Sequence, residues 1–369
     1  MLLYITAEDI FSSDRPERAG PRPLHRIPET VAGLFDLGLR HHIRPAVMAW
    51  PGGEGFEPVP DWKLDRLAIR VALQGRERMG VEPGVRVALF GRLGWLWPVV
   101  DFAAMGFGAV PVGLEHDLSD DTLVEVVERA GPRVLFATDP GSVARALRLR
   151  QEGHLGSATL VGEGLPEEEG LLPLSRLLEL GSILDTAERA QAFRAFSRQI
   201  APESEAMWHA GSEGLSRLTH REAMGRLEGR LRAHPAQKGD VAFVDGPRVT
   251  LGVRLTLAAF VGDGLTTTAL GREGRADEDV AVLRPHKMVL CGDWLEATCE
   301  GQAPRWPAGL DRPRVRRRLM KRLGGRLRRV ETASGISEGT VRALDTAGVT
   351  HEVTETGASE AVHGTETVH

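Results

Sequence analysis

Short apolar runs alternate with amphipathic stretches along most of the chain. From Asp61 to Met79 apolar residues recur at helical spacing and Gly80 follows, which predicts a helix with Asp61 as its N-cap and Gly80 as its stop. The run Val85–Phe90 is continuously apolar, as expected of a short strand buried on both faces. The unit then repeats, as helices over 95–106 and 119–130 followed by strands over 109–112 and 133–137. Such alternation predicts an α/β fold with a mainly parallel sheet.

The second half of the chain repeats this pattern and predicts a second sheet-and-helix layer. Helices are expected over 171–181, 185–205, 221–234, 253–260 and 294–299, and strands over 241–244 and 284–290. We therefore expect four regions along the chain. They are a loosely ordered N-terminal arm over 1–26, a first α/β subdomain over 27–200, a second α/β subdomain over 201–356 and a polar tail over 357–369.

Composition narrows the functional classes. With 42% hydrophobic and 26% charged residues and a formal net charge of −5, the chain has an ordinary globular composition and gives no global case for nucleic-acid binding. The longest apolar run, from Leu93 to Leu114, is interrupted by prolines and Asp101, so we predict no membrane span. Cys291 and Cys299 fit neither a zinc site nor a redox pair, and with no signal-peptide pattern at the start they favour a cytoplasmic protein.

The stretch Met207–Gly214 is the main candidate for chemistry. Gly211 and Gly214 flank Ser212 and Glu213, and small residues in this arrangement let backbone N–H groups converge on a phosphate oxyanion. A helical run begins after the nearby Leu218-Thr219-His220. Taken alone, the same spacing also occurs in ordinary turns.

The order of segments around this loop resembles the N-terminal domain of the adenylate-forming, AMP-binding acyl-CoA synthetases, especially the long-chain fatty acid CoA ligases. Their loop reads Tyr-Thr-Ser-Gly-Thr-Thr-Gly, then Pro-Lys-Gly, and ends in Leu-Thr-His. Here Gly211, Ser212 and Gly214 match the loop, three residues are missing before Leu218-Thr219-His220, and Arg217 is the remaining cation for a phosphate. Glu213 replaces a neutral hydroxyl, and its charge would repel a polyphosphate by roughly 1 to 4 kcal/mol.

Other segments carry the resemblance through the chain. The Trp-led helix from Trp62, the turn at Pro83-Gly84 and the segment Leu323–Val330 follow the scaffold of the family. The resemblance implies two stacked, mainly parallel sheet-and-helix layers. It also implies that the chain lacks the barrel and the small C-terminal domain with its catalytic lysine, because the sequence ends at His369.

The remaining family motifs are eroded in this chain. The adenine-binding Ser-Gly-Gly-Ala-Pro is met by Ser334 and Gly335 alone, and the Tyr-Gly-x-Thr-Glu motif by Thr354 and Glu355, which the resemblance assigns to phosphate and Mg²⁺. Arg248 stands where the family has a histidine near the acyl pocket, although a surface arginine is the commoner case. The alternative for Thr354 and Glu355 is that they belong to a solvated polar tail. His351, His363 and His369 could bind a transition metal, and a solvated polar tail is the alternative for them too.

A basic run lies before the segment Leu323–Val330. It includes Arg312, Arg314, Arg316, Arg317 and Arg318. Because it has no interleaved aromatic residues and falls on an expected scaffold helix, we predict no nucleic-acid partner.

Three functions follow from these observations. The resemblance implies an active ligase that uses ATP, Mg²⁺ and CoA to activate a fatty acid or another carboxylate. The damaged motifs favour a pseudoenzyme, a scaffold that binds a ligand or partner without turnover. The third hypothesis is half of a split enzyme, completed by a separate protein that supplies the C-terminal domain. We favour the pseudoenzyme, because loss of the lysine-bearing domain removes both positioning and charge stabilisation.

Overall fold

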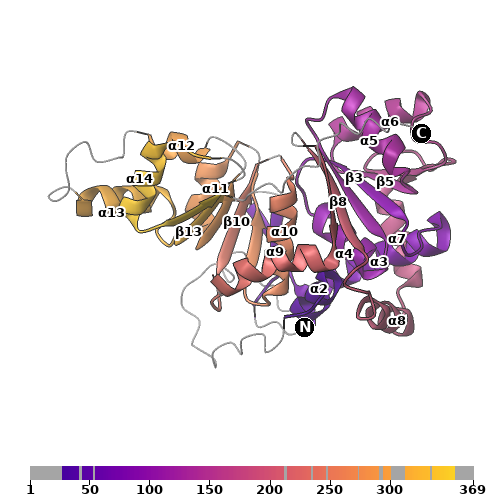
Figure 1. Cartoon of the computed structure of the whole chain (residues 1–369), viewed down its shortest axis with the longest axis horizontal. Helices are drawn as coiled ribbons and strands as arrows, with labels where there is room; N and C mark the ends of the chain where they lie inside the picture. Colours follow the sequence, from indigo (N-terminus) through magenta and orange to yellow (C-terminus); the bar gives the residue numbers. More distant parts are fainter. Residues whose placement is uncertain are drawn as a thin grey trace, which may run out of the picture.

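The computed structural model describes residues 27–40, 44–52, 55–211, 214–233, 236–246, 248–272, 274–290, 294–300, 312–332 and 335–353. These residues form two seven-stranded sheets, each covered by helices (Figure 1). Both sheets are open in the described residues, and neither closes into a barrel. The predicted α/β architecture of two mainly parallel layers is therefore confirmed.

The first sheet has the strand order β7-β6-β5-β3-β4-β8-β9. All neighbouring strands in it are parallel except β8 and β9, which form an antiparallel hairpin. Its strands are β3 (Arg86–Gly91), β4 (Val110–Glu115), β5 (Val134–Ala137), β6 (Thr159–Gly162), β7 (Leu171–Pro173), β8 (Glu205–Gly211) and β9 (Gly214–Thr219).

The second sheet has the order β14-β13-β12-β10-β11-β1-β2. Only the β1–β2 pair is antiparallel. Its strands are β1 (Met48–Gly52), β2 (Gly55–Val59), β10 (Val241–Asp245), β11 (Thr267–Leu270), β12 (Lys287–Leu290), β13 (Arg329–Thr332) and β14 (Thr350–Val353).

Helices connect the parallel strands. They are α2 (Val31–Arg40), α3 (Asp61–Met79), α4 (Leu96–Gly106), α5 (Asp120–Ala130), α6 (Pro140–Gln151), α7 (Leu174–Leu184), α8 (Ala187–Ser197), α9 (His220–Ala233), α10 (Leu251–Gly262), α11 (Ala276–Leu283), α12 (Trp294–Cys299), α13 (Arg312–Arg322) and α14 (Glu338–Ala347). Helix α10 is the central one, because it lies between the two sheets and all of its residues are buried (Figure 1).

Each sheet contains strands from distant parts of the chain. Strands β1 and β2 come from the first quarter of the sequence, yet β1 pairs with β11, so that Met48 lies opposite Thr268. Conversely, β8 follows residue 200 and pairs with β4 of the first sheet. The subdomain boundary at residues 200 and 201 remains a prediction, and each sheet contains strands from both sides of it.

Some helix boundaries were predicted correctly from the local sequence, and others were not. Ser119 caps α5 by accepting a hydrogen bond from the Thr122 N–H, and Gly80 ends α3 in the left-handed conformation, as predicted. The N-cap of α3 is Pro60 and not Asp61, because the Asp61 carboxylate is buried against Arg44. The helix expected from Leu171 begins only at Leu174, after the short strand β7.

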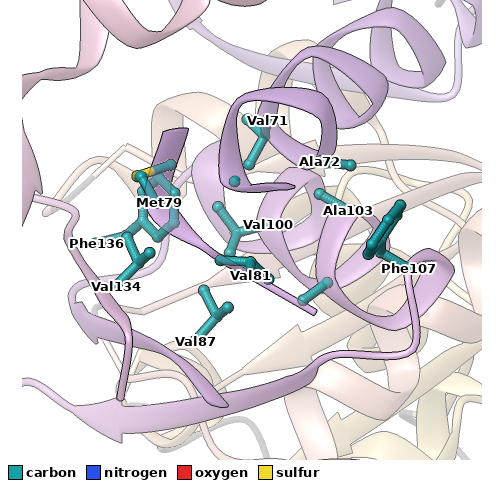
Figure 2. A pocket seen from close by; sticks show the side chains of 12 residues that line it. Val71, Ala72, Met79, Val81, Val87, Val100, Ala103, Phe107, Val134 and Phe136 are labelled. Carbon is teal, nitrogen blue, oxygen red and sulfur yellow. The ribbon is translucent and has the colours of Figure 1, made fainter. Parts of the chain in front are cut away.

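The core of the first sheet contains a small apolar cavity (Figure 2). It lies between α3, α4 and the strands β3 and β5, and its lining includes Val71, Val100, Phe107 and Phe136. Because the lining offers no polar anchor to orient a ligand, the cavity is a packing feature of the scaffold.

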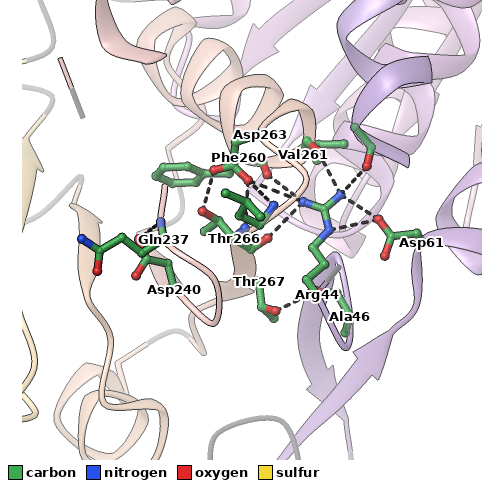
Figure 3. A network of polar contacts seen from close by, with 12 residues as sticks. Arg44, Ala46, Asp61, Gln237, Asp240, Phe260, Val261, Asp263, Thr266 and Thr267 are labelled. Carbon is green, nitrogen blue, oxygen red and sulfur yellow. Dashed lines mark hydrogen bonds and ion pairs between the residues drawn. The ribbon is translucent and has the colours of Figure 1, made fainter. Parts of the chain in front are cut away.

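A buried arginine connects three helices to the second sheet (Figure 3). The Arg44 side chain has no exposed surface, and its guanidinium pairs with the Asp61 carboxylate at 2.7 Å. It also donates hydrogen bonds to four backbone carbonyl oxygens, those of Gly38, Phe260, Val261 and Thr266. Thus α2, α3, α10 and the residue before β11 share one cation.

A second buried pair joins α10 to the first sheet. Arg254 on α10 donates two hydrogen bonds to the Asp101 carboxylate on α4, at 3.0 and 2.6 Å. It donates a third to the backbone carbonyl of Trp208 on β8 at 2.6 Å. The Arg254 side chain has no exposed surface, so this bidentate pair is fully desolvated on the arginine side.

The histidine of the Leu-Thr-His segment has a structural position. His220 is buried at the start of α9, and its Nδ1 accepts a hydrogen bond from the Val31 N–H at 3.3 Å. Burial lowers the pKa of His220 to about 4, because the charged imidazolium cannot be hydrated there.

Acid is therefore expected to destabilise the fold through His220. The stabilisation that comes from burying neutral His220 is fully present above the unfolded pKa of about 6.5. It is lost as the pH falls towards 4, which lowers the free energy of unfolding by about 3 kcal/mol in total. Urea unfolding at pH 7 and pH 4.5 should show a smaller pH dependence for His220→Gln than for wild type. The half-exposed His154→Gln serves as the control, and an unchanged dependence in His220→Gln would contradict the assignment.

Candidate functional site

The glycine loop is the tip of a tight hairpin. Gly211 at the end of β8 is paired with Gly214 at the start of β9, so only two residues connect the strands. Gly214 has a φ of 98°, which a residue with a Cβ rarely adopts. In place of the predicted phosphate-binding loop, the structure has two paired strands before α9. Ser212 and Glu213 lie outside the described residues.

A carboxylate lies directly against the hairpin tip. Glu115, the last residue of β4, is buried, and its Oε1 would be 2.2 Å from a Cβ added at Gly211. A side chain at position 211 would therefore displace the Glu115 carboxylate. The base of the expected phosphate loop therefore carries a negative charge.

Two basic side chains hold the Glu115 carboxylate. His209 Nε2 lies 3.3 Å from its Oε1, and Arg248 Nη2 lies 3.2 Å from its Oε2. Burial alone would raise the pKa of Glu115, but the hydrogen bond and charge of His209 and Arg248 outweigh it and lower the pKa. Burial lowers the pKa of His209 itself. The Glu115 carboxyl is therefore an anion at neutral pH. Because the lowered pKa makes His209 neutral there, Arg248 is the main counter-charge of Glu115.

Arg248 is engaged by acidic residues. Besides Glu115, its Nη2 contacts the Asp117 carboxylate at 3.1 Å. By the family resemblance, Arg248 occupies a histidine position near the acyl pocket. In the structure it bridges Glu115 at the end of β4 and Asp117 just after it, and its side chain is about one-third exposed.

Arg217 lies on the other face of the hairpin. It is directly opposite Trp208 across the β8–β9 pair, and its guanidinium stacks 4.1 Å from the centre of the Trp208 ring. Arg86 of β3 stacks on the same ring at 4.7 Å. Because side chains alternate along a strand, Trp208 and Gly211 face opposite sides of the sheet. Arg217 is thus held away from the side of the hairpin where Glu115 lies.

Of the remaining residues predicted to bind nucleotide or Mg²⁺, the structure describes only Gly335. Gly335 follows β13 in the second sheet, two residues before Ser337, which caps α14. Ser334, Thr354 and Glu355 lie outside the described residues, so their roles stay predictions. Among the described residues, no group of three or more His, Cys, Asp or Glu side chains could hold a metal ion.

Sequence reasoning missed Glu115 and His209. A signal was present, because an apolar strand over 110–114 ends abruptly in Glu115-His116-Asp117. Polar groups at the carboxyl end of a parallel strand are a general sign of a site in α/β folds. Their pairing with His209 depends on the contact between β4 and β8, which are far apart in the sequence.

A charged cavity lies beneath α10, on the side that faces the second sheet. Its volume is about 30 Å³, room for about one water molecule. Its lining combines Thr256 and Asp263 from the α10 region with Lys287, Arg329 and Glu331 from β12 and β13. An alkyl chain placed there would separate these groups from water and from one another, which is costly. The cavity is thus unsuited to a long acyl chain.

None of the described helices combines the length and hydropathy needed to cross a lipid bilayer. Cys299 is buried as predicted, and burial raises the pKa of its thiol to about 11. It is therefore a neutral thiol at physiological pH. Cys291 lies outside the described residues.

Part of the chain is similar in sequence to known enzymes. Residues 63–191 match the family model described as AMP-binding enzyme. The long-chain-fatty-acid–CoA ligases FadD15 of Mycobacterium bovis and Mycobacterium tuberculosis are each 28% identical over 199 residues, which is 52% of this chain. The matched part is 32% of the length of those ligases.

Solved structures share the fold over most of the chain. The A-PCP didomain of carboxylic acid reductase from Segniliparus rugosus, in complex with AMP, has a TM-score of 0.64 at 16% identity, over 89% of this chain and 52% of that one. The N-terminal domain of FACL13 from Mycobacterium tuberculosis has a TM-score of 0.64 at 14% identity, over 88% of this chain and 74% of that one. In its matched segment the chain is thus similar to AMP-binding enzymes and to long-chain-fatty-acid–CoA ligases, and its described residues share the fold of the FACL13 N-terminal domain.

Proposed function

We propose that this chain is a pseudoenzyme of the acyl-CoA synthetase type, which retains the scaffold but does not adenylate a fatty acid by itself. The observation that supports this proposal is the Glu115 carboxylate packed against Gly211 at the hairpin tip. In this family a loop at this point is expected to surround the phosphates of ATP. Here the same place presents an anion.

The charges around the hairpin do not fit a polyphosphate. Two like charges a few Å apart repel by roughly 1 to 4 kcal/mol, and the sequence adds Glu213 to Glu115. The two nearby cations are engaged, Arg248 by Glu115 and Asp117 and Arg217 by the ring of Trp208. The two-residue connection also leaves little backbone to converge on an oxyanion.

A different role suits the same scaffold. The cavity beneath α10 has a charged lining and a volume of only about 30 Å³, so it disfavours a long alkyl tail, and the chain would act as a binding protein for a partner. Fatty acid, ATP, Mg²⁺ and CoA would be the reactants of an active relative. A separate C-terminal domain protein would be needed for the split-enzyme alternative.

Calorimetric titration with ATP, with and without Mg²⁺, tests the proposal. Wild type should give no saturable heat up to about 1 mM ATP, and Glu115→Gln combined with Glu213→Thr should bind at least tenfold more tightly, because both repulsive charges are gone. Glu125→Gln, an exposed change on α5, is the matched control and should behave like wild type.

Two outcomes would overturn the proposal. Micromolar binding of ATP by wild type would show that the carboxylates do not exclude the nucleotide and would favour a split ligase. Release of pyrophosphate by the wild-type chain with fatty acid and ATP would show an active enzyme. Circular dichroism of each variant should confirm that the buried Glu115→Gln change leaves the fold intact.

A further inference from the structure

The segment 312–329 is strongly basic in a chain whose net charge is −5. It contains no acidic residue and ten basic ones, which are Arg312, Arg314, Arg316, Arg317, Arg318, Lys321, Arg322, Arg326, Arg328 and Arg329. Most of it forms α13, which packs on α14 and α11 at the end of the molecule farthest from the first sheet (Figure 1). The charge is thus concentrated at one end of the fold.

Helix α13 has two distinct sides. Leu319 and Leu323 are fully buried and fix the helix to the core of the second sheet. On the other side, four exposed cations follow the spacing i, i+3, i+4 and i+7, which places them on one face of a helix. We call this set the cationic face; it consists of Arg314, Arg317, Arg318 and Lys321.

The cationic face lacks counter-charges among the described residues. Arg328 and Arg329 of the same segment pair with Asp240 and Glu331, as buried or half-buried charges usually do. By contrast, none of the four cations of the face makes an ion pair or hydrogen bond with another described residue. Like charges at this spacing repel one another, so a partner that supplies negative charge would stabilise the face.

We propose that the cationic face docks this protein on an anionic phospholipid bilayer. The four cations lie along one side of a single helix, which suits an extended anionic surface. The segment 312–329 has no aromatic residue that could stack on bases, which disfavours a nucleic acid. It also has its apolar side chains Leu319 and Leu323 turned inward, so the contact is electrostatic and needs no insertion.

Each cation near an anionic membrane surface strengthens binding by roughly fivefold, and salt screens the effect within a Debye length. Binding should therefore require anionic lipid and should weaken steeply between about 0.1 M and 0.5 M salt. This inference is independent of the proposed function, because it involves neither the hairpin nor the cavity beneath α10.

Vesicle co-sedimentation of the full chain tests it. Wild type should bind vesicles of phosphatidylcholine with about one-third phosphatidylglycerol, and not vesicles of phosphatidylcholine alone. Reversal of two charges of the face, Arg317→Glu with Arg318→Glu, should weaken binding roughly 25-fold or more. The matched control Arg78→Glu with Arg129→Glu makes the same change in net charge at exposed positions of α3 and α5. It should lose much less of the vesicle binding.

Three results would overturn the inference. They are equal binding to neutral vesicles, equal loss in the face variant and the control variant, and face-dependent binding of duplex DNA or RNA in the absence of vesicle binding. If the charge-reversed variant does not fold, the milder Arg314→Gln with Lys321→Gln replaces it, and should weaken vesicle binding roughly 25-fold while the melting temperature stays within a few degrees of wild type.

Discussion

Replacing Arg44 with methionine is expected to lower the free energy of unfolding by about 4 kcal/mol or more, enough to unfold a marginally stable protein. The change removes the cation that pairs with the buried Asp61 carboxylate and one donor from each of four backbone carbonyl oxygens, of which that of Val261 also accepts from the Gly264 N–H (Figure 3). Each unsatisfied buried acceptor costs about 1 to 3 kcal/mol, and the unpaired carboxylate costs more.

Chemical unfolding followed by circular dichroism measures this loss. Arg78→Met, an exposed change on α3, is the control and should alter the unfolding free energy by less than about 0.5 kcal/mol. The double variant Arg44→Met with Asp61→Leu should recover part of the stability, since it removes the orphaned charge. A loss below about 1 kcal/mol for Arg44→Met would mean that the network contributes little.

The second large effect is expected at the pair between Asp101 and Arg254. Asp101→Ala should destabilise the fold by about 3 to 5 kcal/mol, because it leaves the fully buried Arg254 guanidinium without a carboxylate. The remaining bond to the Trp208 carbonyl cannot neutralise that charge. The loss should be larger than for Asp121→Ala, an exposed change on α5.

A double-mutant cycle separates the pair from its surroundings. If the two side chains act as a unit, Asp101→Ala with Arg254→Met should cost less than the sum of the two single changes, by at least about 1 kcal/mol. Additive losses would show that each side chain acts through other contacts.

Local patterns predicted most elements, because their information lies within each segment. The cap at Ser119 and the stop at Gly80 depend on side chains and backbone angles a few residues apart. Asp61 was misassigned for the opposite reason, since its partner Arg44 is brought to it by the tertiary fold. A carboxylate that could cap a helix serves instead in a long-range ion pair.

The location of the candidate site remains a prediction from the sequence. The resemblance predicts a phosphate loop at Gly211 and Gly214, and the match to AMP-binding enzymes covers residues 63–191, before this loop. Whether the loop can accept a phosphate depends on Glu115, Arg248 and the face on which Arg217 lies, all of which are set by pairing between β4, β8 and β9. Thr354 and Glu355 stay predictions.

The exchange of strands between the sheets has a consequence for how the chain reaches its native state. The β1–β11 pair joins Met48 to Thr268, so the second sheet incorporates its early strands only after some 220 further residues have emerged from the ribosome. Contacts of such high sequence separation fold slowly and leave edges exposed in the meantime. During synthesis the β1–β2 hairpin therefore remains unpaired until β11 has been made. We expect nascent chains of this protein to depend on chaperones more than chains whose domains fold one after another along the sequence.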